Sequence, residues 1–275
     1  MDVVAVGTPA CNIAKNFEVY EQYQIYYIDI GLTGKNCFSL PRAKTMEEVE
    51  QNTPKFTNLI KNLQNKVMFV CSGGGVSSGS ILAILEQMKH LNVDVFYIQP
   101  DIVLLNEKAR LRSRIVFRVL QEYARSGMLK KLFLIGNKEV SKILGDLSIS
   151  EYYIKINSLI AESIHMLNFL KNADSTMTNL SKIRDINQIA TFGIYNMEEQ
   201  DEKYFFNIEN IREKQFYFAF NEDTLEKEKD LLNKISGYVE KAGQSDLTSV
   251  SYDITATTYE TDFAYIISHT NFIQE

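Results

Sequence analysis

A glycine- and serine-rich run at residues 73–80 contains the residues of this sequence best suited to chemistry. Its small residues are Gly73, Gly74, Gly75, Ser77, Ser78 and Gly79. An apolar run at 67–70 precedes it, and an apolar pattern with helical spacing follows at 81–88. Glycines let backbone N–H groups approach an anion, and the first turn of a helix presents unpaired donors. The order strand, glycine turn, helix therefore predicts phosphate binding, with a merely tight strand-to-helix connection as the alternative.

Two common phosphate motifs are absent from this run. No Lys-Ser or Lys-Thr pair follows the glycines, as a Walker loop requires. Three adjacent glycines also do not give the G-x-G-x-x-G spacing of dinucleotide-binding folds.

A second strand–turn–helix unit opens the chain. The apolar run 3–6 leads into residues 7–12, which read Gly-Thr-Pro-Ala-Cys-Asn, and a helical pattern follows. If both strands lie parallel in one sheet, the two turns face the same ligand. The alternative reading of Asn12 is a helix N-cap.

Composition excludes several classes of protein. The chain has 275 residues, 45% of them hydrophobic and 23% charged, and a net charge of −6, so it lacks the basic footprint of a nucleic-acid-binding protein. We expect no membrane segment, because no apolar run approaches about 18 residues, and no signal peptide. The three cysteines and three histidines are scattered, which argues against a metal site or a disulfide framework and favours the cytoplasm.

The order of elements predicts an α/β fold. Predicted strands at 3–6, 24–30, 67–70, 93–98 and 131–135 alternate with predicted helices at 13–17, 45–65, 81–88 and 105–126. Pro54 should break the second helix, and residues 31–45 are interpreted as a loop. This alternation is typical of a mainly parallel sheet.

The second half predicts one long helix and a smaller domain. Residues 150–170 are apolar on more than one face, so this helix should be buried between two layers. Beyond it we predict a short helix at 177–186, a loop at 196–213, a helix at 224–241 and strands at 190–194, 216–220, 249–258 and 262–269. We therefore divide the chain into a nucleotide-binding domain (1–147), a central core helix (148–172) and a C-terminal domain (173–275).

The arrangement resembles the tubulin/FtsZ superfamily. That family's glycine loop reads GGGTGSG, and residues 73–79 read GGGVSSG, which matches at five of seven positions. The first loop of the FtsZ branch reads GGAGCNA, and residues 7–13 keep its first glycine and its Cys-Asn. The resemblance implies a parallel-sheet, Rossmann-like GTPase domain, a long central core helix and a smaller C-terminal α+β domain.

The resemblance also implies a guanine-nucleotide site for GTP or GDP and leaves Mg²⁺ open as a further cofactor. Tyr153 takes the place of the aromatic residue that stacks on guanine, and Asn157 takes the place of the residue that bonds its edge. Pro100, Arg114 and Asn137 take further family positions. The residues implied to bind nucleotide are Gly7, Cys11, Asn12, Gly73, Gly74, Gly75, Ser77, Ser78, Gly79, Arg114, Tyr153 and Asn157.

Departures from the family pattern bear on hydrolysis. Val76 replaces a hydroxyl, Pro9 removes an N–H donor, and residues 31–45 show no third phosphate loop. Polymerising relatives carry N-x-D-x-x-D after the core helix, and those carboxylates complete the GTPase site of the next subunit. Only Asp174, within Asn172-Ala173-Asp174, keeps one of them, and losing such a group costs roughly 10²–10⁴ in rate.

Three functions remain open at this stage. The first is a small protein that binds guanine nucleotide and assembles with itself head to tail into filaments, with weak or lost hydrolysis. The second is a degenerate relative that serves as a structural scaffold or interaction protein. The third is an unrelated α/β enzyme that binds a nucleotide or sugar phosphate, although no set of general acid and base residues supports it.

Overall fold

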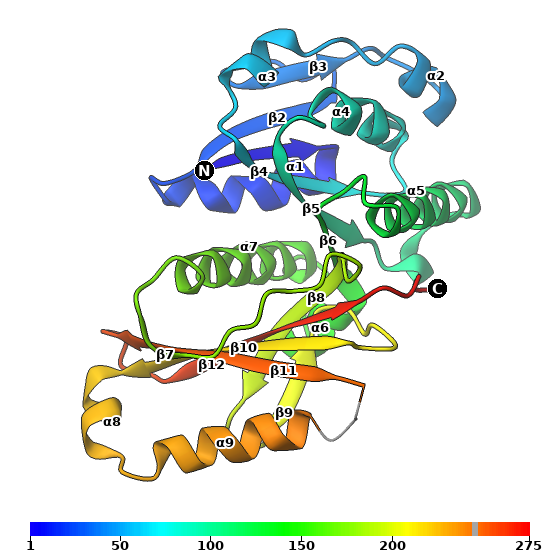
Figure 1. The fold of residues 1–275 in the computed structure, drawn as a ribbon. Coiled ribbons are helices and arrows are strands. Elements are labelled where there is room, and N and C mark those ends of the chain that lie inside the picture. The colour runs from blue at the N-terminus through cyan, green and yellow to red at the C-terminus, as the bar shows by residue number, and fades with distance from the viewer. Residues whose placement is uncertain (244–246) are drawn as a thin grey trace.

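The strands form one sheet through the length of the molecule. The computed structural model describes residues 1–243 and 247–275. Within these residues twelve strands form one sheet in the order β3-β2-β1-β4-β5-β6-β8-β12-β10-β11-β7, with β9 paired to β8 (Figure 1). The strands of the N-terminal half are β1 (Asp2–Val6), β2 (Gln24–Ile30), β3 (Cys37–Leu40), β4 (Lys66–Ser72), β5 (Asn92–Gln99) and β6 (Lys131–Gly136).

The strands of the N-terminal half are all parallel, as the alternation of elements predicts. β1 lies between β2 and β4, and Val6 is paired with Cys71 at the carboxyl ends of β1 and β4. Because these two strands end side by side, the turns that follow them are neighbours.

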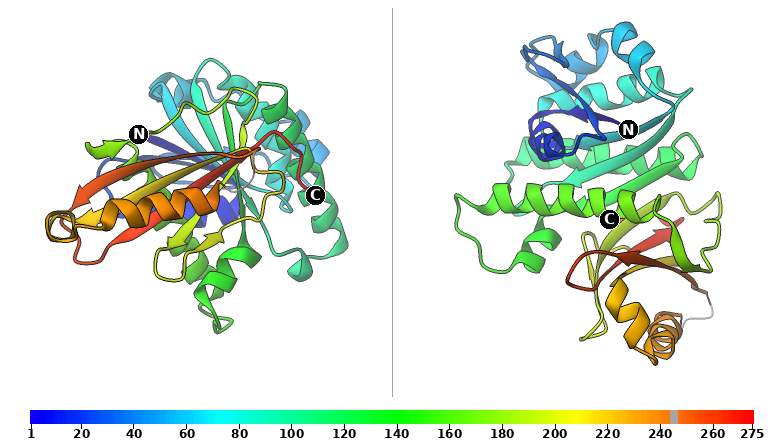
Figure 2. Two further views of the ribbon diagram at one scale, coloured as in Figure 1. Left: turned by 60° about the horizontal axis from the view of Figure 1, so that its bottom comes forward. Right: turned by 90° about the vertical axis from the view of Figure 1, so that its left-hand side faces the viewer.

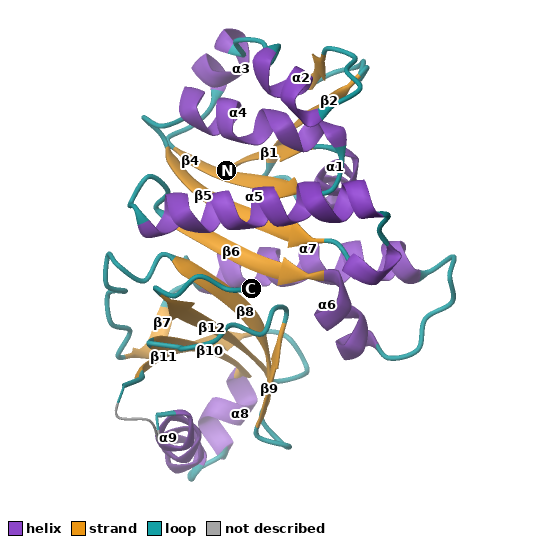
Figure 3. Cartoon of the chain, turned by 90° about the vertical axis from the view of Figure 1, so that its right-hand side faces the viewer, coloured by secondary structure: helices purple, strands orange, loops and turns teal. Residues whose placement is uncertain are grey.

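Helices cover both faces of this half. One face is covered by α4 (Ile81–Gln87) and α5 (Glu107–Arg125), whose buried residues pack on Val6, Phe69 and Leu134 (Figure 3). The other face is covered by α1 (Thr8–Ala14), the 3₁₀ turn η1 (Lys15–Val19) and α7 (Tyr152–Leu170). The shorter helices are α2 (Met46–Gln51), α3 (Thr57–Asn62) and α6 (Asn137–Leu144).

Helix α7 is the central element. It runs across the middle of the molecule between the N-terminal strands and the C-terminal strands (Figures 1 and 2). Ile156, Ile160, Ile164 and Leu167 recur at spacings of three and four and are buried in a core shared with the sheet and α1. The prediction of a long buried helix at 150–170 is confirmed, with its start at Tyr152.

The C-terminal strands form a mixed sheet, as predicted. They are β7 (Ser175–Thr178), β8 (Ile189–Asn196), β9 (Asp201–Tyr204), β10 (Glu213–Asn221), β11 (Ser249–Thr257) and β12 (Phe263–Thr270). α8 (Glu222–Lys227) and α9 (Leu231–Ala242) follow β10, and α9 covers the outer face through Leu231 and Ile235. β6 and β8 pair at two positions, so strand pairing continues between the halves and the proposed domain boundaries stay predictions.

Several local predictions are wrong, and the largest error concerns residues 177–186. In place of a helix, β7 pairs with β11 and an extended segment follows. Met177 and Ile186 are 44% and 60% exposed, so a helix here would have had no apolar face to bury, whereas the edge of β11 offered backbone partners.

Smaller differences from the prediction concern two loops and the ends of two helices. The predicted loops at 31–45 and 196–213 contain the edge strands β3 and β9, and Phe205 and Phe206 beside β9 are buried. The predicted helix at 224–241 divides into α8 and α9 because Glu228 is extended. The helix at 45–65 ends before Pro54 and resumes at Thr57, which confirms the predicted break.

Within the described part of the chain, no helix combines the length and the apolar character needed to span a membrane.

Candidate nucleotide site

The first turn of the site follows β1. Gly7 has φ +87°, a conformation that glycine adopts without strain, and its N–H donates to the Ile28 carbonyl at 2.9 Å. α1 begins directly after it with Thr8, and Pro9 fits because the first N–H groups of a helix have no partner within the helix. Asn12 lies in the middle of α1, so its interpretation as an N-cap is wrong.

The second turn follows β4 and is built from adjacent glycines. Gly74 has φ +92°. A Cβ at Gly73 would lie 2.5 Å from Tyr97 Oη and 2.7 Å from Ser113 Cα, so α5 packs directly against the glycine backbone. After Gly75 the chain enters a 3₁₀ turn, η2 (Val76–Ser80), and then α4. The glycines are therefore needed both for the turn and for the close approach of α5.

The two turns and the start of α7 meet around one cavity of about 410 Å³. Six of the residues predicted from sequence line it: Asn12, Gly73, Gly74, Gly75, Tyr153 and Asn157. They come from positions up to 145 residues apart and meet because β1 and β4 end side by side against the start of α7. This volume is in the range of small-molecule sites.

The α7 end of the cavity offers a flat ring and two amides. Tyr153 is 54% exposed and makes an edge-on contact with Tyr152 at 5.0 Å between centroids. Asn157 lies one turn later along the helix. Asn137, at the start of α6, is 7% exposed, and its Oδ1 has no hydrogen-bond partner. A buried acceptor without a partner is costly, so a donor on a ligand would stabilise it.

Seven predicted residues do not line this cavity. Ser78 donates to the Gly75 carbonyl at 2.6 Å within the turn and to the Met46 sulfur at 3.6 Å. A Cβ at Gly79 would lie 2.1 Å from the Met46 carbonyl oxygen, so both residues lie against α2. Ser77 is buried, with its Oγ close to Gly7. Their roles, and the roles of Gly7, Cys11, Arg114 and Asp174, stay predictions.

The remaining predicted residues are placed by α1, α5 and α7. Cys11 points into the core toward the Ala5 carbonyl, and burial together with the nearby Asp29 raises the pKa of its thiol to about 12, so the thiol is neutral. Arg114 is exposed on α5. Asp174 is exposed beyond the C-terminal end of α7, whose 19 residues span about 28 Å, so it lies at the opposite end of that helix from Tyr153.

Sequence reasoning left eight lining residues out of the predicted set. They are Thr8, Pro9, Ile13, Ser72, Ile98, Pro100, Leu105 and Asn137. Most of them directly follow or end a parallel strand, and that position was the signal that could have identified them. Pro100 and Asn137 are also positions that take part in the family resemblance.

The lining is neutral. None of the described residues that line the cavity carries a charged side chain. Asp29 accepts a hydrogen bond from the hydroxyl of the lining residue Thr8 at 2.6 Å. No group of three His, Cys, Asp or Glu side chains among the described residues could hold a metal ion.

Comparison with solved structures identifies the fold. An FtsZ dimer from M. jannaschii matches with a TM-score of 0.70 at 14% identity, covering 98% of this chain and 87% of that one. CetZ2 from Haloferax volcanii, in a GTPγS-bound protofilament, matches with a TM-score of 0.71 at 12% identity over 98% and 92% of the two chains. The chain has the tubulin/FtsZ fold.

A third structure and two negative results complete the comparisons. A GTPγS-form protofilament of TubZ from Bacillus thuringiensis serovar israelensis matches the tubulin/FtsZ-like chain with a TM-score of 0.69 at 11% identity, over 98% of this chain and 86% of that one. No family model and no curated protein sequence matches.

Proposed function

We propose that this protein binds a guanine nucleotide and assembles with itself head to tail into cytoplasmic filaments, with weak or lost GTP hydrolysis. The observation that carries the proposal is the single cavity at which Asn12, the glycine turn, Tyr153 and Asn157 converge. A glycine turn suits phosphates, a tyrosine ring suits a base, and an amide offers both a donor and an acceptor to the base edge.

The choice of guanine rests on the fold and on the amides. Structures of this fold include GTPγS-bound and GDP-form protofilaments of other proteins. Asn157 offers a donor for the guanine oxygen and an acceptor for its N–H groups, and the partner-free Asn137 Oδ1 offers a further acceptor. If Mg²⁺ takes part, the phosphates and water must supply most of its ligands.

Weak hydrolysis follows from the acids that are missing. Asp174 is the one carboxylate kept from the family pattern, and it lies at the far end of α7 from the cavity of its own copy. It can reach a nucleotide only in a neighbouring copy. With one acidic group in place of two, water beside that nucleotide is poorly oriented.

Titration of the pure protein with fluorescently labelled GTP and ATP tests the nucleotide claim. We expect GTP to bind more tightly than ATP, and we expect Asn157→Ala to weaken GTP about tenfold or more, since two hydrogen bonds are lost. Ser158→Ala is the matched control on the same helix, because the Ser158 hydroxyl donates to Glu162 instead. Absence of binding, or a preference for ATP, would reject the proposal.

The scaffold function is the second candidate, and the neutral cavity lining favours it. Light scattering with and without GTP separates the two. Assembly that does not respond to nucleotide would favour the scaffold.

A further inference from the structure

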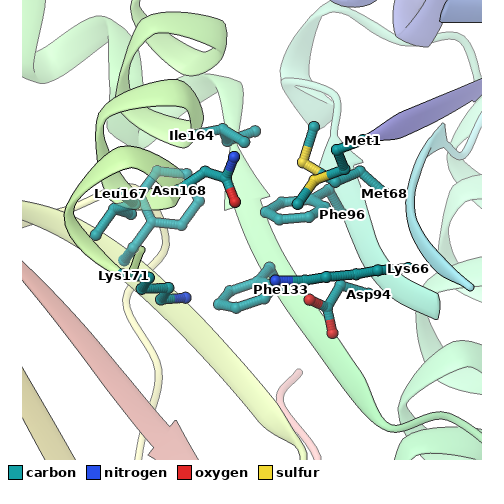
Figure 4. Close-up of a pocket in the computed structure, with 11 residues that line it drawn as sticks. Met1, Lys66, Met68, Asp94, Phe96, Phe133, Ile164, Leu167, Asn168 and Lys171 are labelled. Carbon is teal, nitrogen blue, oxygen red and sulfur yellow. The ribbon is translucent and has the colours of Figure 1, made fainter. Parts of the chain in front are cut away.

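A second, smaller pocket lies at the opposite end of the same strand and helix that build the candidate nucleotide site. Lys66 begins β4, and the glycine turn follows the end of that strand. Lys171 follows the last residue of α7, and Tyr153 lies in its first turn. Lys66 and Lys171 line a pocket of about 30 Å³, which we call the basal pocket (Figure 4).

Two lysine amines converge in the basal pocket. Figure 4 shows the side chains of Lys66 and Lys171 pointing toward Phe133 from opposite sides, and Lys171 Nζ lies 5.3 Å from the centroid of that ring. A third lysine, Lys131, begins β6, where it is the register partner of Asp94 on β5. Two strands and the residue that follows α7 thus place three amines in one region.

The positive charge in this region is incompletely balanced. Asp94 is the only acidic residue among those that line the pocket. Across the described residues, no carboxylate lies within 4.0 Å of the amines of Lys66, Lys131 or Lys171. The lining around these lysines includes the apolar side chains Phe96 and Phe133, and positive charges gathered beside apolar groups without a close carboxylate are unfavourable.

The ionisation of Lys171 reflects this imbalance. Desolvation by the surrounding protein, together with the positive charges of Lys131 and Lys66, lowers the pKa of Lys171 to about 7, although Asp94 opposes the shift and the residue as a whole is exposed. Burial also lowers the pKa of Lys131, against the opposing effect of Asp94. An anion in the pocket would raise the pKa of both lysines.

The candidate nucleotide cavity lacks the positive charge that phosphates need, because no charged side chain lines it. A triphosphate held there would have only neutral groups of its own subunit around it. In a head-to-tail stack along α7, the basal end of one copy faces the nucleotide end of the next. We propose that Lys66, Lys131 and Lys171 of one copy bind the terminal phosphates of the nucleotide held in the adjoining copy.

This inference rests on the proposed function and changes the expected chemistry of the contact. Where family polymerases offer two carboxylates to the neighbouring nucleotide, this chain offers three ammonium groups and the exposed Asp174. Ammonium groups neutralise phosphate charge without orienting water, so they favour assembly over hydrolysis.

The double variant Lys66→Gln/Lys171→Gln tests the proposal. Critical concentration is measured by sedimentation with GTPγS and with GDP, and nucleotide affinity is measured below that concentration. We expect the GTPγS critical concentration to rise at least tenfold, the GDP value to change less, and monomer affinity to stay within twofold. Lys130→Gln is a control for the loss of a lysine charge, because it removes one positive charge from an exposed residue next to Lys131 and should change nothing. Lys171→Arg should retain most assembly.

The outcomes separate this inference from the proposed function. If the wild-type protein assembles with GTPγS and the double variant does so equally well, the inference fails and the proposed function stands. Equal loss with GTPγS and GDP would reject the terminal phosphates as the ligand in favour of a protein carboxylate. A loss of nucleotide affinity in the monomer would mean that the lysines act within one copy, which also rejects the inference.

A phosphate titration of the monomer, followed by ³¹P NMR, distinguishes free phosphate from neighbour-bound phosphate. Millimolar binding that is lost in the double variant, together with normal assembly of that variant, would show a site for free phosphate only and overturn the intersubunit role. If the wild-type protein neither binds GTP nor assembles, the proposed function fails and the intersubunit role fails with it.

Discussion

Alanine replacements at Gly73 and Gly75 separate packing from ligand contact, since both glycines line the cavity but differ in their surroundings. A Cβ at Gly73 would lie 2.5 Å from Tyr97 Oη and 2.7 Å from Ser113 Cα, which belongs to the packed helix α5. At Gly75 the nearest heavy atom, Ser77 Oγ, would be 3.6 Å away, in ordinary contact, and φ is −76°. The two substitutions should therefore affect different properties.

The magnitudes follow from these contacts. Overpacking of a core position costs about 1–3 kcal/mol, and for 275 residues an unfolding entropy of about 0.6 kcal/mol/K converts that into a fall in Tm of about 2–5 °C for Gly73→Ala. Gly75→Ala should leave Tm within about 1 °C. It should weaken GTP about fivefold, because a methyl group beside the backbone donors costs about one hydrogen bond, or about 1 kcal/mol.

Differential scanning fluorimetry and nucleotide titration of both variants measure these effects. A Gly73→Ala protein with wild-type Tm would refute the close packing of α5 on the loop. A Gly75→Ala protein with wild-type GTP affinity would refute the placement of phosphates at this turn.

Three further predictions concern other parts of the chain. Gly79→Ala should lower Tm more than Gly75→Ala does, because its Cβ would lie 2.1 Å from the Met46 carbonyl oxygen; equal Tm values would contradict the packing of this glycine on α2. Lys171→Met should raise Tm near pH 7 and lose this advantage toward pH 10. The pKa of about 7 for Lys171 in the folded protein lies below its value in the unfolded chain, so the wild-type protein gains stability as pH rises from about 7 toward 10. A difference in Tm between variant and wild type that does not depend on pH would contradict the lowered pKa of this amine. His269 is fully buried, and burial holds its pKa well below the usual range. Its contribution to stability is therefore present above about pH 6.5 and is lost as pH falls below that value. In urea unfolding, the stability of His269→Leu should respond less than that of the wild-type protein to a change from pH 7 to pH 5, and an equal response would argue against this.

Much of the fold could be predicted because periodicity and glycine chemistry are local properties. The strands before Gly7 and Gly73 are short apolar runs, and α7 carries apolar residues at helical spacing, so the sequence alone indicates all three elements. The segment at 177–186 carries the same helical spacing and yet forms a strand and an extended segment, because the edge of β11 lies beside it. No property of that segment alone contains this information.

The site was predictable to the level of loops and helices but not of individual side chains. The glycine run indicated phosphate binding, yet the sequence does not show that Ser78 and Gly79 turn toward α2 while Gly73 to Gly75 line the cavity. The grouping of the three lysines near the basal pocket could not be predicted from the sequence either. Lys66 and Lys131 begin separate strands and Lys171 follows α7, and only the packing of that helix on the folded sheet brings them together.

A cryo-EM map of the protein incubated with GTPγS tests the central claim most directly. We predict head-to-tail filaments in which the base lies against Tyr153 and Asn157 and the phosphates lie on Gly73 to Gly75. Lys66 and Lys171 of the adjoining copy should lie beside the terminal phosphate. Filaments whose subunits meet without nucleotide at that junction, or a nucleotide bound away from the start of α7, would contradict it.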